Sequence, residues 1–183
     1  MRHVLWINSL RRVALALTLL TLAIFVLLNG RPSFTNASRP PRFSGDAQLS
    51  LQFVRSVEDV DLILGEAPSP DREVMRIKQY IDFAFIAAYT ALFLILSALV
   101  VRRGGWQLAT GIAAGICGIA AGAFDVLEDR AILNLLDVPL RATTPDMLNA
   151  IRRASAAKWT LAAVTLILLS TYFVPLKKHE SPS

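Results

Sequence analysis

Four long apolar runs limit the folds that this sequence can adopt. Each run is close to the roughly 20 residues that a helix needs to cross the hydrocarbon core of a bilayer. The runs are Val13–Leu28, Phe83–Val101, Trp106–Leu127 and Trp159–Leu176. Because 54% of the 183 residues are hydrophobic, the chain has room for one membrane bundle and two modest loops, but not for a second soluble domain.

The sequence therefore predicts an all-α fold, an integral membrane four-helix bundle in which residues 1–183 form a single domain. The predicted spans are about 13–29, 80–101, 106–127 and 157–176. The first run is interpreted as an uncleaved anchor. The alternative is a cleaved signal peptide with its small-residue site at Thr35–Ala37.

Basic residues predict the orientation of the chain in the membrane. They precede the first run, fill the turn between the second and third runs, and follow the fourth. Cytoplasmic segments beside membrane helices carry an excess of Lys and Arg, so we expect both termini in the cytoplasm and the loops 30–79 and 128–156 outside. These basic residues are Arg2, Arg11, Arg12, Arg102, Arg103, Lys177 and Lys178. This distribution explains the net charge of +5 as topology and argues against nucleic-acid binding.

The first long loop carries signals of a small extracytoplasmic cap between the first and second spans. Residues 49–54 alternate between apolar and polar side chains, which is typical of a short strand. Ser56 is a suitable N-cap for a short helix that Gly65 ends. We therefore expect a strand and a helix that pack on the outer mouth of the bundle.

Two further helix starts resemble each other and predict a layer of charges. Ser69–Asp71 and Thr144–Asp146 each place a capping hydroxyl, a proline and an acid in order. Asp82 and Lys158 follow their prolines by nearly equal distances, and Asp125 lies near the outer end of the third span. The sequence thus predicts that Asp82 and Lys158 lie within pairing distance. The full cluster, for ligand binding or ion pairing, is Asp82, Asp125, Glu128, Asp129 and Lys158.

Small and aromatic residues predict how the helices pack. Gly111, Gly115, Gly118 and Gly122 form one stripe on the third span, a pattern typical of closely packed membrane helices. Asp125 and Asp129 extend this stripe. Tyr89, Phe93 and Thr165 are candidates for lining a pocket, with ordinary core packing as the alternative.

Two segments carry a resemblance to known proteins. Tyr80–Ile86 (YIDFAFI) and Ala123–Asp129 (AFDVLED) are similar to a pattern in small, uncharacterised four-helix membrane proteins of bacteria. The resemblance implies a four-helix fold and a bacterial inner membrane, and it implies no activity. Where that pattern has Asn after the Glu, this chain has Asp129.

The chemistry of the side chains favours binding over catalysis. With the single cysteine Cys117, and His3 and His179 in the tails, no intramolecular disulfide, haem bundle or His-based zinc site is expected, and no cofactor is predicted. The favoured function is non-enzymatic binding of a partner, lipid or small ligand at a charged outer mouth. The alternatives are a membrane-embedded enzyme that uses Asp and Glu as metal ligands or as acid and base on a lipid, and a transporter or channel subunit. A metal at the carboxylates is left open.

Overall fold

The computed structural model describes residues 2–30, 33–34 and 47–174, and this part of the chain is almost entirely helical. The elements in chain order are α1 (Arg2–Asn29), α2 (Ala47–Leu51), α3 (Val57–Leu64), α4 (Pro70–Val101), α5 (Trp106–Leu136), the 3-10 helix η2 (Leu140–Ala142), α6 (Pro145–Ser170) and the 3-10 helix η3 (Thr171–Phe173). The predicted all-α fold with four long apolar helices is confirmed.

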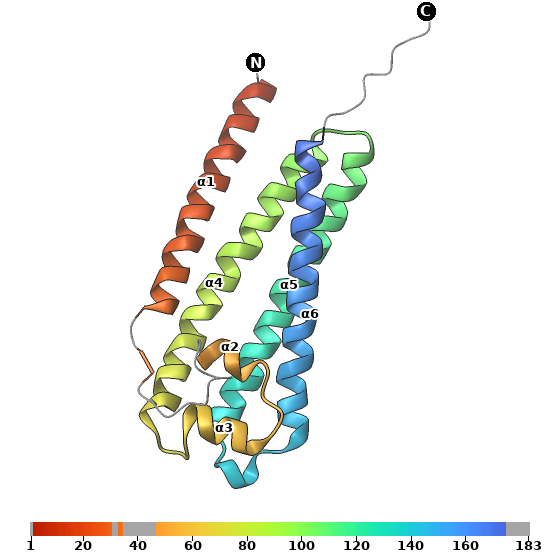
Figure 1. The fold of residues 1–183 in the computed structure, drawn as a ribbon. Helices are drawn as coiled ribbons and strands as arrows, with labels where there is room; N and C mark the ends of the chain where they lie inside the picture. Colours follow the sequence, from red (N-terminus) through yellow and green to blue (C-terminus); the bar gives the residue numbers. More distant parts are fainter. Residues whose placement is uncertain (1, 31–32, 35–46, 175–183) are drawn as a thin grey trace, which may run out of the picture.

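The four long helices lie side by side, and the short ones gather at one end (Figure 1). α5 packs along both α4 and α6, whereas α1 packs mainly along α4. The start of α1, the turn between α4 and α5, and the end of α6 lie together, and we call this the terminal end. α2, α3 and η2 lie at the opposite end, which we call the cap end. Successive long helices therefore run in opposite directions along the bundle.

The starts of three helices follow from local capping chemistry. The hydroxyls of Ser56, Ser69 and Thr144 accept hydrogen bonds from backbone N–H groups three residues onward, and Pro70 and Pro145 are the first helical residues. A proline at this position removes an N–H that would lack a partner in any case. The helix starts predicted from the sequence are confirmed.

The long helices are apolar enough to cross a membrane, and their outer faces are apolar too. The four candidate spans are Ile7–Asn29, Pro70–Val101, Trp106–Leu136 and Pro145–Phe173. Leu15, Val26, Ile116 and Ile167 are each more than 60% exposed. With 32 residues, α4 is about 48 Å long, which exceeds a hydrocarbon core of about 30 Å by roughly three turns. The helices are thus long enough to carry the cap clear of a bilayer.

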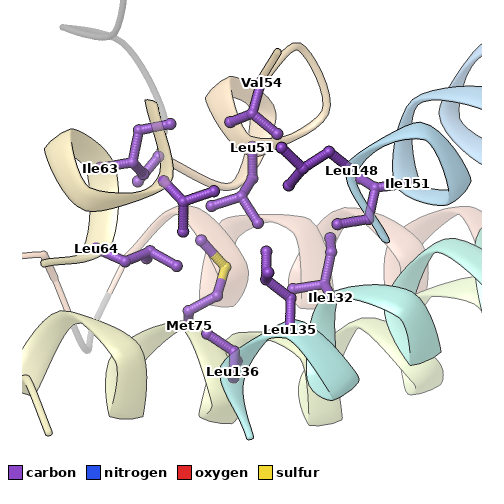
Figure 2. Close-up of a cluster of buried hydrophobic side chains, with 12 residues drawn as sticks. Leu51, Val54, Ile63, Leu64, Met75, Ile132, Leu135, Leu136, Leu148 and Ile151 are labelled. Atoms are coloured by element: carbon purple, nitrogen blue, oxygen red, sulfur yellow. The ribbon is translucent and has the colours of Figure 1, made fainter. Parts of the chain in front are cut away.

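The largest buried hydrophobic cluster lies under α2 and α3 (Figure 2). Leu51 and Val54 point from the cap toward Met75 of α4, Ile132 of α5 and Ile151 of α6, and all five side chains are 0% exposed. Burial of such side chains stabilises by about 1.5–3 kcal/mol each, before the entropy of ordering the segment is counted. The cap is therefore packed onto three of the long helices.

The predicted strand in the cap is wrong, because the segment forms α2. Within α2, Ala47, Ser50 and Leu51 are buried, and these positions follow the three-and-four spacing of a helix. A strand would bury every second residue instead. The alternation in residues 49–54 is too short for periodicity to separate the two structures.

Basic side chains from α4 hold the ends of neighbouring helices. The ammonium group of Lys78 donates to the carbonyl of Leu28 near the end of α1. Arg72, which is only 2% exposed, donates to the carbonyls of Gly65 (3.0 Å) and Val138 (3.1 Å). Carbonyls at helix C-termini lack partners within the helix, so these contacts tie the cap end together.

The glycine stripe of α5 faces α4. A Cβ atom added at Gly111 would lie 2.7 Å from the backbone nitrogen of Val101, and one at Gly118 would lie 2.9 Å from the Cβ of Phe93. Gly115 lies over Ser97 and Gly122 over Thr90. The absence of side chains on this stripe lets α5 approach α4 closely. This close approach brings Asp125 and Asp129 of α5 near Asp82 of α4.

Candidate functional site

Three carboxylates from two helices converge near the cap end. Asp82 belongs to α4, and Asp125 and Asp129 lie one helical turn apart on α5. Each residue offers a carboxylate oxygen, and these oxygens all lie within 4.8 Å of one another. The three residues are 6%, 6% and 0% exposed. We call them the carboxylate triad.

Lys158 of α6 forms ion pairs with one member of the triad and with a fourth acid. Its ammonium nitrogen lies 2.6 Å from Asp125 Oδ1 and 3.0 Å from Glu128 Oε2. Lys158 is 8% exposed and Glu128 is 1% exposed. Asp125 Oδ2 also accepts a hydrogen bond of 2.9 Å from the Tyr89 hydroxyl. One positive charge is thus shared between two buried carboxylates.

The predicted ion pair between Asp82 and Lys158 does not form. Among the described residues, the ammonium of Lys158 has carboxylate oxygens of Asp125 and Glu128 within 4.0 Å, but none of Asp82. Asp82 Oδ2 instead accepts a 2.7 Å hydrogen bond from Gln48 Nε2 of α2. The sequence predicted that these charged residues lie close together, but the predicted partner of Lys158 within the cluster was wrong.

Asp129 has neither a counter-charge nor a hydrogen-bond donor in the described part of the chain. Both of its carboxylate oxygens are buried without a partner. Arg130 of α5 and Arg152 of α6 are both exposed, and Arg152 donates to Asn149. An unpartnered carboxylate in a dry interior is strongly destabilising unless a proton or a cation neutralises it.

Two glutamines that the sequence reasoning missed connect the cap to the site. Gln48 donates to Asp82, and Gln52 Oε1 accepts a 2.9 Å hydrogen bond from Trp159 Nε1 of α6. Gln48 belongs to α2, and Gln52 follows the last residue of this helix. Both contacts depend on how this segment packs against α4 and α6, which spacing in the sequence does not indicate.

The proposed pocket-lining residues have different roles. Tyr89 binds Asp125, and its ring packs edge-on against the ring of Phe93 with centroids 5.5 Å apart. Phe93 also covers Gly118. Thr165 is fully buried and donates to the carbonyl of Leu161 in its own helix. Among these three residues, only Tyr89 has a hydrogen bond to the acidic cluster in the described structure.

The charge balance of the cluster determines what it can do chemically. Four buried carboxylates, those of Asp82, Asp125, Glu128 and Asp129, face the single ammonium of Lys158. If all are ionised, three negative charges remain in a region where uncompensated charge is costly. Protons or a bound cation can remove this cost, and carboxylate oxygens are the ligands that hard divalent cations prefer.

No protein-family model, curated protein or solved structure matches the chain. The similarity to small bacterial four-helix membrane proteins therefore stays a prediction, and the site has to be interpreted from its own geometry.

Proposed function

We propose that the protein is a four-span membrane protein of a bacterial inner membrane, with cytoplasmic termini and an extracytoplasmic cap, that binds a hard divalent cation in the carboxylate triad. The observation that carries this proposal is Asp129, which is fully buried, has no partner in the described structure and lies against two other carboxylates. The sequence predicts binding of a partner, lipid or small ligand at a charged outer mouth, and this proposal names a divalent cation as the ligand and the carboxylate triad as its site.

The spacing of the triad supports a cation. Ca²⁺ binds oxygen ligands at about 2.3–2.6 Å, so oxygens on opposite sides of the ion are separated by about twice that distance. Carboxylate oxygens of all three residues lie within 4.8 Å of one another, which is compatible with one shared ion. A double positive charge would also offset most of the excess negative charge in the cluster.

The distribution of charge along the helices favours a one-sided binding site over transport. Residues 83–101, 106–124 and 159–174 contain no Asp, Glu, Lys, Arg or His, so these apolar runs offer no further charged group between the triad and the terminal end. Charged groups inside a membrane commonly mark an ion path. A site without such a path suits structural or regulatory cation binding.

Cation-dependent stability tests the proposal. We expect Ca²⁺, Mg²⁺ or Mn²⁺ to raise the melting temperature of the full chain after chelator treatment, by an amount equivalent to about 2.7 kcal/mol at one hundred times the dissociation constant. Asp129→Asn should abolish this increase, and elemental analysis should show that it also abolishes bound metal. The matched control is Glu73→Gln on α4, because the Glu73 side chain is 68% exposed.

Two results together would contradict the cation proposal. If no divalent cation changes the melting temperature and Asp129→Asn is more stable than the wild type, protons neutralise the cluster and the cation proposal is wrong. A buried carboxyl group that needs a proton to be tolerated is replaced by an amide without loss.

A further inference from the structure

An apolar cavity of about 460 Å³ lies at the terminal end, between α1, α4 and α6. Ala14 of α1, Leu96 and Leu99 of α4, and Leu166 and Leu169 of α6 line it. It lies where α1 packs along α4 and not closely along α6. Its volume lies within the range of sites that hold small apolar molecules.

The polar groups of this cavity gather at one end of it. Arg11 and Tyr172 belong to the lining, and the Arg11 guanidinium donates to the Tyr172 hydroxyl at 3.2 Å. The guanidinium of Arg103 lies 4.6 Å from the centre of the same ring. Two guanidinium groups therefore converge on Tyr172, and Arg103 also donates to the backbone carbonyls of Tyr172 and Val174.

The acidic residues of the chain lie elsewhere. Those in the described part of the chain fall within residues 58–82 and 125–146, which belong to the cap end or lead to it. Within the described ranges, α1, the second half of α4, the first half of α5 and the second half of α6 contain no Asp or Glu. Within the described residues, the guanidinium groups around Tyr172 form no ion pair with a carboxylate, and they are complementary to an anion from outside this part of the chain.

We infer that the cavity is a binding site for an anionic phospholipid, with one acyl chain between α1 and α6 and the phosphate group against Arg11 and Arg103. An apolar slot that ends in guanidinium groups matches an acyl chain that ends in a phosphate, and guanidinium groups bind phosphate oxygens in paired hydrogen bonds. This site is separate from the carboxylate triad and does not depend on a bound cation, but it rests on the proposed insertion of the four helices in a membrane.

Native mass spectrometry of the full chain, reconstituted with equal amounts of phosphatidylglycerol and phosphatidylcholine, tests the inference. We expect selective retention of phosphatidylglycerol and a roughly fivefold decrease in that retention for Arg11→Gln, the effect of losing one basic contact with an anionic headgroup. Arg12→Gln is the matched control, because Arg12 is also exposed on the same helix but does not line the cavity. It should retain the lipid like the wild type.

A second variant tests the acyl-chain part of the site. Leu166 lines the cavity and is 58% exposed, so Leu166→Trp should fill the slot without disturbing the core, and should lower phosphatidylglycerol retention as well. Equal losses for Arg11→Gln and Arg12→Gln would reduce the effect to diffuse charge attraction and overturn the inference. Unchanged retention in Leu166→Trp, or displacement of the lipid by glycerol phosphate alone, would overturn it too.

Discussion

Lys158 is the residue on which the ionic balance of the acidic cluster depends. Its ammonium contacts Asp125 and Glu128, and all three residues are buried. Removing one partner of a buried ion pair leaves the other charge uncompensated, which costs about 3–5 kcal/mol. We therefore expect Lys158→Met to lower the free energy of unfolding, measured by denaturant titration in detergent, by this amount.

The control for this change is Arg153→Met on the same helix. Arg153 is exposed, and a substitution at such a position usually changes stability by less than about 0.5 kcal/mol. If the carboxylate triad holds a cation, added divalent salt should restore part of the stability that Lys158→Met loses. A Lys158→Met variant as stable as the control would show that the ion pair contributes nothing.

For single residues, the sequence predicts the position of a side chain along the helix axis better than it predicts which side chain forms an ion pair with it. The positions of Asp82 and Lys158 after their helix starts placed both in one layer, because the rise per residue of a helix is nearly constant. Whether Lys158 meets Asp82 or Asp125 depends on helix rotation and on side-chain rotamers. These follow from packing with neighbouring helices, which spacing in one sequence does not contain.

The packing of α5 against α4 depends on glycines that differ in how much space they have. A methyl group at Gly111 would meet the Val101 backbone nitrogen at 2.7 Å, whereas at Gly115 the nearest atom, Ser97 Cβ, is 3.6 Å away. Backbone cannot move aside as a flexible side chain can. We expect Gly111→Ala to lower the melting temperature in detergent, equivalent to about 1–3 kcal/mol of overpacking.

Gly115→Ala is the matched substitution for this prediction. It adds the same methyl group to the same helix at an ordinary contact distance, and alanine favours a helix over glycine by up to about 1 kcal/mol. We expect its melting temperature to equal or exceed that of the wild type. Equal losses for the two variants would show that the stripe responds to any side chain, and not to the close approach at Val101.

Elements with strong local signals were predicted, and the element without one was not. Ser69 and Thr144, each followed by a proline, fixed the starts of α4 and α6, since capping depends on neighbouring residues alone. α2 has five residues, and its helical form is stabilised by the burial of Ala47 and Leu51 beneath the cap. That tertiary contribution has no signature in a segment this short.

At the scale of the whole molecule, the chain separates its charges between two ends. The cap end holds the carboxylate triad with its partner Lys158, and the terminal end holds Arg11, Arg12 and Arg103. The apolar runs between the two ends predicted the four long helices. A segment that crosses lipid has to pair its own backbone hydrogen-bonding groups and expose apolar side chains, and a helix does both. The cavity beside α1 was not predicted, because it depends on the angle between helices.

This separation leads to a prediction about orientation. Arginines near the first span tend to keep their side of a membrane protein in the cytoplasm, so we expect the terminal end inside the cell and the cap end outside. In a Cys117→Ala background, a cysteine at Glu66 should react with an impermeant maleimide in intact cells. A cysteine at Arg102, in the turn between α4 and α5, should react only after lysis. Both positions are exposed, so access to reagent and not burial decides the result. The reverse labelling pattern would place the carboxylate triad at the cytoplasmic face and contradict the proposed extracytoplasmic cap.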